Sequence, residues 1–229
     1  MIVHTFPDAL AAARAAAERL AALAREAVQA RGRFTVALSG GHSPWHMLEA
    51  WAALDTPWAG VHVFQVDERV APAGDPDRNA THIGESLLAR APIPRAQVHL
   101  MPVEASDLAA AAARYAETLA AVAAAPPVLD LVHLGLGPDG HTASLVPGDP
   151  VLDVAGADVA LTGPYQGHRR MTLTYPALDR ARRVLWLVTG EDKPAMLARL
   201  RAGDRAIPAG RIRSDAAEVF ADAAAARDL

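Results

Sequence analysis

Hydrophobic and polar positions follow two different patterns along this chain: a helical period in some segments and short, continuous apolar runs in others. Over residues 8–31, apolar side chains such as Leu20 and Val28 recur every three to four positions, which predicts a helix. Asp8 is a suitable residue to cap its start, and Gly32 to end it. Shorter apolar runs with no helical period, such as 34–38, predict buried strands. Segments of these two kinds alternate along most of the chain.

This alternation predicts an α/β fold. In chain order, we expect a helix over 8–31, a strand over 34–38, a helix over 44–54, a strand over 61–66, a helix over 79–90, a strand over 98–101, a helix over 106–124, strands over 128–134, 170–174 and 184–188, and helices over 193–201 and 214–226. Alternating strands and helices form mostly parallel sheets with helices on both faces. No repeat or linker interrupts the pattern, so we expect one domain over residues 1–229.

Composition narrows the class of protein. The 229 residues suffice for a full core, and 52% hydrophobic with 21% charged residues is typical of a soluble globular protein. A net charge of −4 argues against nucleic acid as the main partner. The absence of cysteine excludes disulfides and thiolate chemistry. With neither a membrane-length apolar run nor a signal-peptide pattern, we expect a cytoplasmic protein with no membrane partner.

The strand predicted over 128–134 is followed by the most informative segment of the chain. Gly135, Gly137 and Gly140 come within six residues, with Asp139 among them, and His141 follows at once. Glycines let backbone N–H groups turn toward a ligand, and ligands of open α/β sheets bind at this end of the strands. A histidine there suits proton transfer near neutral pH. A tight turn with a structural histidine is the alternative interpretation.

A second candidate segment follows the strand over 34–38. There, Gly40, Gly41, His42 and Ser43 lead into a predicted helix. Backbone N–H groups at a helix start favour negative charge, so this turn is a candidate phosphate site, although an ordinary strand-to-helix turn remains an alternative. The spacing matches neither a nucleotide-binding P-loop nor a nucleophile elbow.

Charged residues follow other predicted strands. Asp67 and Arg69 come directly after residues 61–66, where they either brace a loop or hold sugar hydroxyls and an anion. Arg169 and Arg170 open the strand over 170–174, and we expect Arg169 to be the solvated one. Lys193 begins a predicted helix, where the helix dipole disfavours a cation unless an anion lies nearby.

Together these segments resemble the superfamily of 6-phosphogluconolactonase and glucosamine-6-phosphate deaminase/isomerase, and the lactonase branch in particular. The resemblance spans essentially the whole chain and is most specific in the block around His141. The matching blocks are Leu38-Ser-Gly-Gly-His-Ser-Pro44, Asp67-Glu-Arg69, Asp77-Arg-Asn79, Gly135-Leu-Gly-Pro-Asp-Gly-His-Thr-Ala-Ser-Leu-Val-Pro147, Arg170-Met-Thr-Leu-Thr-Tyr-Pro176, Thr189-Gly-Glu-Asp-Lys193 and Ile207-Pro-Ala209.

The resemblance implies a Rossmann-like three-layer α/β/α sandwich that hydrolyses 6-phospho-D-glucono-1,5-lactone without metal or cofactor. It assigns acid–base catalysis to His141. It places the phosphate at the turn 40–43, Arg170 and Lys193, and Asp67 and Arg69 near the sugar ring. From the chemistry of lactone hydrolysis, we expect Arg69 or the backbone around Gly137, Asp139 and Gly140 to stabilise the developing oxyanion. The expected partner is a small sugar-phosphate lactone, and the expected state is a monomer or weak homodimer.

Two positions depart from the family pattern, and three other functions compete. His42 stands where the family usually has a small hydroxyl residue, and Arg78 where serine is common. The deaminase/isomerase carries a carboxylate five residues after the motif histidine, whereas this chain has Val146. A non-catalytic sugar-phosphate sensor would have lost His141. A metallohydrolase has little support, because His42 and His46 lack an evident third ligand.

Overall fold

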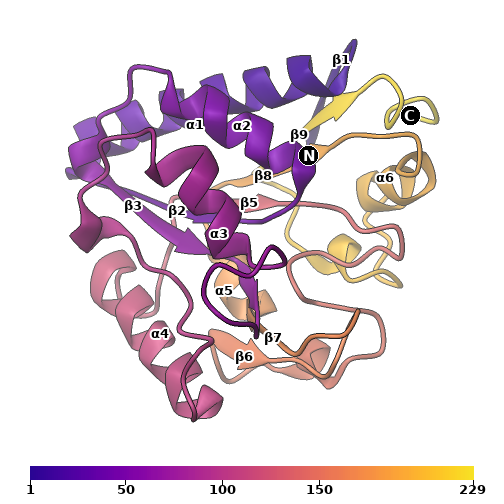
Figure 1. Cartoon of the computed structure of the whole chain (residues 1–229). Helices are drawn as coiled ribbons and strands as arrows, with labels where there is room; N and C mark the ends of the chain where they lie inside the picture. Colours follow the sequence, from indigo (N-terminus) through magenta and orange to yellow (C-terminus); the bar gives the residue numbers. More distant parts are fainter.

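The computed structural model describes residues 1–229, apart from the side chain of His42. Its centre is a six-stranded sheet in the order β1-β9-β8-β5-β2-β3 (Figure 1). All its strand pairs are parallel. The strands are β1 (Ile2–Phe6), β2 (Phe34–Leu38), β3 (Val61–Gln65), β5 (Leu131–Leu134), β8 (Val184–Val188) and β9 (Ala217–Asp222).

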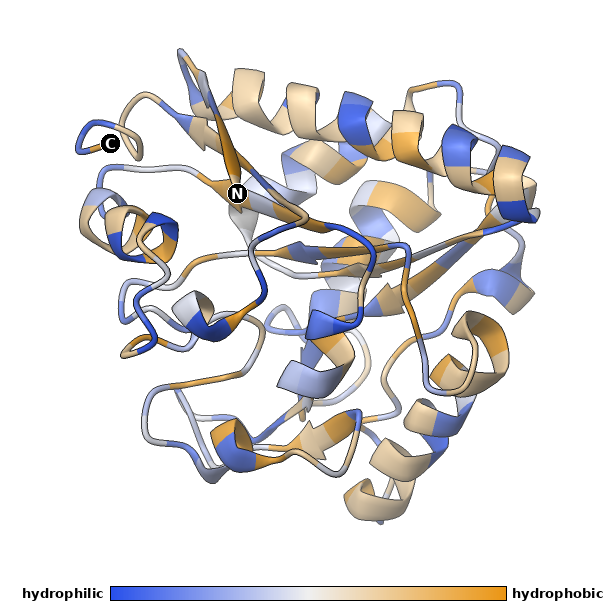
Figure 2. Cartoon of the chain, turned by 180° about the vertical axis from the view of Figure 1, so that it is seen from behind, coloured by the Kyte–Doolittle hydropathy of each residue, from blue (hydrophilic) through white to orange (hydrophobic). Residues whose placement is uncertain are grey.

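Helices cover both faces of this sheet, as the alternating pattern predicts (Figures 1 and 2). Leu185 and Leu187 pack into one hydrophobic cluster, whereas Trp186 and Val188 pack into the other. Side chains of a strand alternate between faces, so both faces of β8 must be apolar. The first cluster includes residues of α1 (Ala9–Arg31), α2 (His42–Ala52) and α3 (Asn79–Ile83), and the second includes residues of α4 (Leu108–Ala123), α5 (Tyr175–Asp179) and α6 (Pro194–Arg201).

A small antiparallel sheet lies beside the main one. It has the order β4-β7-β6, formed by β4 (Asp67–Arg69), β7 (Arg170–Leu173) and β6 (Val159–Leu161). Thr172 is the partner of Asp67, and Arg170 is the partner of Arg69. The small sheet therefore brings two of the charged segments next to each other.

The topology creates a crevice between two neighbouring strands. β2 and β5 are paired, but the chain leaves β2 through α2 on one face and reaches β8 from β5 through α5 on the other. Such a switch point opens a crevice at the carboxyl ends of the strands, where ligands of α/β proteins bind. Both glycine-rich segments begin at this point.

Some predicted elements are wrong. The sequence predicts a helix over 214–226, but these residues contain strand β9. β9 pairs with β1 on one side and β8 on the other, and these remote partners override the helical propensity of its alanines. The sequence pattern does not predict edge strand β1. Residues 98–101 form no strand, and only Val98 makes an isolated bridge, to Val63.

Other elements differ in extent or setting. The strand expected over 128–134 begins at Leu131. The segment 170–174 does form a strand, β7, but in the antiparallel sheet. Strands β4 and β6 are not predicted, because three residues are too few to show a period. The helix expected over 79–90 is α3 followed by a π-helical turn over Gly84–Leu88.

A buried carboxylate joins β4 to α3. Glu68 is 0% exposed and accepts hydrogen bonds of 2.8 Å from the backbone N–H groups of Asn79 and Ala80 at the start of α3. Arg78 Nε lies 3.2 Å from Glu68 Oε2, and Arg78 Nη1 donates to Glu104 at 2.8 Å. Glu68 therefore fixes the loop beside the crevice, and Arg78 takes part in this structural cluster.

We expect Glu68→Ala to lower the free energy of unfolding by about 3–5 kcal/mol, because it removes the buried charge partner of Arg78 together with the acceptor of the Asn79 and Ala80 N–H groups. Glu104→Ala is the matched control, since it removes the other carboxylate of Arg78 from a side chain that is 54% exposed. Its cost should be at most about 1 kcal/mol. Urea unfolding of both variants measures the difference, and a loss in Glu68→Ala as small as that expected for Glu104→Ala would contradict a structural role of Glu68.

A buried histidine supports the turn after β2. His133, on β5, is 0% exposed, and its Nδ1 accepts a hydrogen bond from Ser39 N at 3.3 Å. Because Nδ1 accepts, Nε2 carries the proton of the neutral ring. Burial lowers the pKa of His133 to about 3.

This histidine should make stability depend on pH in the acidic range. Above pH 6.5, the ordinary pKa of histidine, the ring is neutral whether the chain is folded or not, so His133 contributes no pH dependence. As the pH falls from 6.5 toward 3, the unfolded chain binds a proton that the folded chain does not. The unfolding free energy should then decrease by up to ~1.4 kcal/mol per pH unit. In His133→Gln, urea titrations between pH 6.5 and about 4 should give a shallower slope, and an unchanged slope would contradict this role.

Candidate functional site

A polar cleft of about 260 Å³ lies at the carboxyl ends of β2 and β5. It brings together eight of the residues predicted from the sequence: Gly40, Gly41, Asp67, Arg69, Gly137, His141, Arg170 and Lys193. Its other lining residues are Ser39, Asn79, Gly135, Leu136, Pro138 and Ala143. Segments far apart in the sequence thus form one site, at the switch point of the sheet.

His141 is held at the cleft by its neighbour in sequence. Its Nδ1 lies 2.5 Å from Asp139 Oδ1, and its backbone N–H donates to the same oxygen at 3.1 Å. A Cβ atom at Gly137 would overlap the imidazole ring, so the ring needs glycine at that position. Asp139 does not line the cleft, and its role here is to orient the histidine.

The charge of Asp139 determines the tautomer of His141. Burial acts to raise the pKa of Asp139, but hydrogen bonds from His141 outweigh it and the pKa is lowered overall. An ionised Asp139 accepts a hydrogen bond from Nδ1–H, which leaves the lone pair of Nε2 available as a base. Tyr165 donates from its hydroxyl to Asp139 Oδ2 at 3.0 Å. Burial, followed by Asp139, raises the pKa of Tyr165, so the phenol remains a donor.

Three cationic side chains line the cleft. Arg69 and Arg170 lie directly opposite each other on the paired strands β4 and β7. Two like charges in such a position repel each other and destabilise the pair. Arg170 is only 3% exposed, and its Nε has no hydrogen-bond partner among the described residues. Lys193, the single lysine of the chain, contacts Asp192 at 2.8 Å. An anion in the cleft would relieve this concentration of positive charge.

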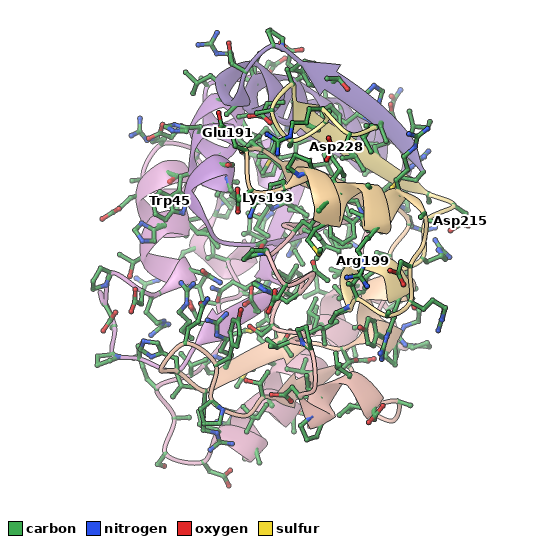
Figure 3. All side chains as sticks on the ribbon, turned by 90° about the vertical axis from the view of Figure 1, so that its right-hand side faces the viewer. Trp45, Glu191, Lys193, Arg199, Asp215 and Asp228 are labelled. Atoms are coloured by element: carbon green, nitrogen blue, oxygen red, sulfur yellow. The ribbon has the colours of Figure 1, made fainter. Side chains whose placement is uncertain are left out.

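Figure 3 shows the position of Lys193, the residue at the start of α6. Lys193 is found between Trp45 of α2 and the labelled Arg199 farther along α6. Gly190, before it, has a φ of 114° and donates its N–H to Asp222 at 3.1 Å. Asp222, buried at the end of β9, therefore fixes the turn that carries Lys193.

The turn after β2 contributes backbone atoms to the cleft. Gly40 packs so closely on Asn79 that a Cβ atom would overlap the amide of that side chain. Neither Gly40 N nor Gly41 N makes a hydrogen bond to another described residue, and α2 begins directly afterwards. Ser43 lies outside the cleft lining, with its Oγ 2.5 Å from Thr189 Oγ1. The predicted contact from the side chain of His42 lies outside what the structure describes.

Asp67 is a buried carboxylate at the cleft floor. It is 5% exposed and accepts hydrogen bonds from Ser144 Oγ at 2.5 Å and Asn79 Nδ2 at 3.2 Å. Burial raises its pKa, although Ser144 and Arg170 oppose that rise. Asp67 therefore combines a structural role with access to the cleft.

The structure places the two neighbouring arginines at the start of β7 differently. Arg170 lines the cleft, whereas Arg169 is exposed and donates nothing to the site, as expected. Gly140 lies outside the lining, and its N–H donates to Gly137 O at 3.0 Å. The sequence places Asn79 in a block that matches the family pattern, but it does not predict Asn79 as a lining residue. Nothing in the sequence around Tyr165 indicates its contact with Asp139.

The described residues also bear on metal binding and on membrane insertion. No three His, Cys, Asp or Glu side chains among them converge as a metal site would require. None of the described helices is long and apolar enough to cross a lipid bilayer.

Comparison with known proteins identifies the family. Residues 7–221 match the family model described as glucosamine-6-phosphate isomerases/6-phosphogluconolactonase. A 6-phosphogluconolactonase from a Nostoc species is 35% identical over 235 residues, covering 99% of this chain and 98% of the relative. The crystal structure of 6-phosphogluconolactonase from Thermotoga maritima has 28% identity and a TM-score of 0.86, covering 96% of this chain and 98% of that chain.

A solved structure of a protein with the sister activity has the same fold. A monomeric glucosamine-6-phosphate deaminase has a TM-score of 0.87 over 100% of both chains, but at 17% identity it shows the shared fold alone. The Rossmann-like α/β arrangement expected from the sequence is thereby confirmed. The chain belongs to the family of glucosamine-6-phosphate isomerases and 6-phosphogluconolactonases.

Proposed function

We propose that this protein hydrolyses 6-phospho-D-glucono-1,5-lactone to 6-phospho-D-gluconate, with His141 as the acid–base group. The observation that carries the proposal is the His141–Asp139 pair at a cleft lined by Arg69, Arg170 and Lys193. Full-length similarity to a 6-phosphogluconolactonase supports the same reaction. Because strands from both ends of the chain, β1 and β9, pair in the central sheet, we take residues 1–229 as one functional domain.

The phosphate would occupy the cationic part of the cleft. Lys193 and Arg170 supply charge-assisted donors, and the N–H groups of Gly40 and Gly41 belong to a turn that opens α2. Binding energy from the phosphate would orient the lactone carbonyl carbon, C1, against the base. The buried Nε of Arg170, which lacks a partner among the described residues, fits this role.

Hydrolysis then needs one proton to move twice. His141 Nε2 takes a proton from water as the water oxygen forms its bond to C1. When the bond from C1 to the ring oxygen breaks, the imidazolium returns that proton to the ring oxygen, which leaves as a hydroxyl. The product is an open-chain acid, and no other reactant is required.

The N–H groups of the two glycines in the turn already donate to the backbone and do not reach the developing oxyanion. The N–H of Gly137 donates to His141 O at 2.9 Å, and that of Gly140 donates to Gly137 O, so neither is available. Arg69 lines the cleft and provides a charged donor. We therefore assign stabilisation of the oxyanion to Arg69. We further propose that Asp67 contacts the substrate and that the reaction needs no metal.

A direct assay tests this function. Freshly generated 6-phosphogluconolactone should be converted much faster than by spontaneous hydrolysis, with or without chelator. His141→Ala should lower kcat by about 10²–10⁴-fold, since general acid–base catalysis contributes that much. His46→Ala, with a side chain 58% exposed on α2, is the matched control and should be fully active. A near-normal rate in His141→Ala would refute the assignment, and ammonia release from glucosamine 6-phosphate would favour the deaminase instead.

The single lysine allows a chemical test of the phosphate site. An acylating reagent that modifies amines should neutralise Lys193 and raise KM by about 10–100-fold, the value of one charge-assisted hydrogen bond. Inorganic phosphate should protect against this loss. Lys193→Arg keeps a positive charge that the reagent does not modify, so its KM should not change on treatment. Equal sensitivity of the variant would trace the loss to the N-terminal amine and place the phosphate elsewhere.

A further inference from the structure

One aromatic side chain contacts both functional halves of the cleft. Tyr165 stands at the tip of the hairpin between β6 and β7. It donates its backbone N–H to His168 O at 2.9 Å, and its carbonyl accepts from His168 N at 3.2 Å. The two turn residues, Gln166 and Gly167, have φ values of 49° and 85°. Two positive φ values mark the tight turn preferred in hairpins, so the backbone of Tyr165 is well fixed.

The hydroxyl of Tyr165 contacts the acid–base pair. It lies 3.0 Å from Asp139 Oδ2 and 3.4 Å from His141 Nδ1. The two rings are edge to face, with centroids 5.4 Å apart. The side chain of Asp139 is 36% exposed, and its hydrogen bonds from His141 N and Nδ1 both go to Oδ1, so Oδ2 needs a further hydrogen bond to fix the plane of the carboxylate. The hydroxyl supplies that bond while Oδ1 remains on the imidazole.

The ring face and backbone of Tyr165 contact the cationic half. The guanidinium carbon of Arg170 lies 5.0 Å from the ring centroid, within the range of a cation–π interaction. Arg170 Nη2 also donates to Tyr165 O at 3.5 Å and to Gln166 Oε1 at 3.3 Å. These contacts occupy one edge of the guanidinium and leave its Nε unpaired among the described residues.

We propose that Tyr165 is a positioning residue with two separable functions. Its hydroxyl holds Asp139 so that His141 keeps Nε2 toward the substrate, and its ring holds Arg170 toward the phosphate. The proposal rests on the lactonase function proposed above. Through Tyr165, the hairpin between β6 and β7 would take part in the reaction at the end of β5.

Two substitutions separate the functions. Tyr165→Phe removes the hydroxyl alone, so kcat should fall by about 10–100-fold, the value of one hydrogen bond to a charged carboxylate, while KM stays within about twofold. Tyr165→Leu also removes the aromatic face, so KM should rise in addition by about 3–10-fold. The matched control is Tyr175→Phe, which removes a hydroxyl that donates to Pro208 O at 3.1 Å outside the cleft lining. Its kcat and KM should equal those of the wild type.

A measurement without substrate tests the hydroxyl separately. In protein with ¹⁵N-labelled histidine, the Nδ1–H proton of His141 should be visible by NMR in the wild type and in Tyr175→Phe. In Tyr165→Phe it should broaden through exchange with water, because a carboxylate that has lost its Oδ2 hydrogen bond holds the Nδ1–H proton less firmly. Absence of lactonase activity in the wild type would refute the proposed function and leave this readout intact. An unchanged Nδ1–H signal together with unchanged kcat in Tyr165→Phe would overturn the role of Tyr165.

Discussion

The pairing of β2 with β5 is the constraint on which the site depends. These strands are adjacent in the sheet, yet Ser39 and His133, which touch at their ends, are 94 residues apart in the chain. Parallel strands place their carboxyl ends on one edge, and the chain leaves this pair on opposite faces of the sheet. The two glycine turns must therefore border the same crevice. Every other part of the site is arranged around it.

Electrostatics gives the crevice its preference for anions. The register of the small sheet sets Arg69 beside Arg170, and the turn fixed by Asp222 adds Lys193. Asp67 partly offsets these charges, but Ser144 and Asn79 already occupy its oxygens. Burial lowers the pKa of Arg170, a sign that the guanidinium lacks full compensation within the protein. Such a cluster is stable when a doubly charged group such as phosphate completes it.

The two sheets divide the work of the protein. The main sheet is buried on both faces and holds the glycine turns rigidly, whereas the small sheet supplies side chains from β4, β7 and the hairpin tip. Glu68 and Arg78 join β4 to α3 in a cluster with no access to the cleft. The position of Arg78, where the family pattern has serine, is explained by this cluster. The departure affects how the loop is held rather than which residues line the cleft.

The sequence by itself determined the parts of the protein that depend on neighbouring residues. Apolar runs identified β2 and β8 with their observed bounds. The glycine turns, His141 and Lys193 stood out by local chemistry, and the resemblance to a known family favoured Arg170. Only the tertiary structure decided the rest. Residues 217–222 became a strand because β1 and β8 pair with them, although their local composition favoured a helix. Tyr165 reached Asp139 across 26 residues through a hairpin whose register no local pattern records. Contacts of this kind depend on backbone pairing between distant segments, and a period along the chain carries no information about it.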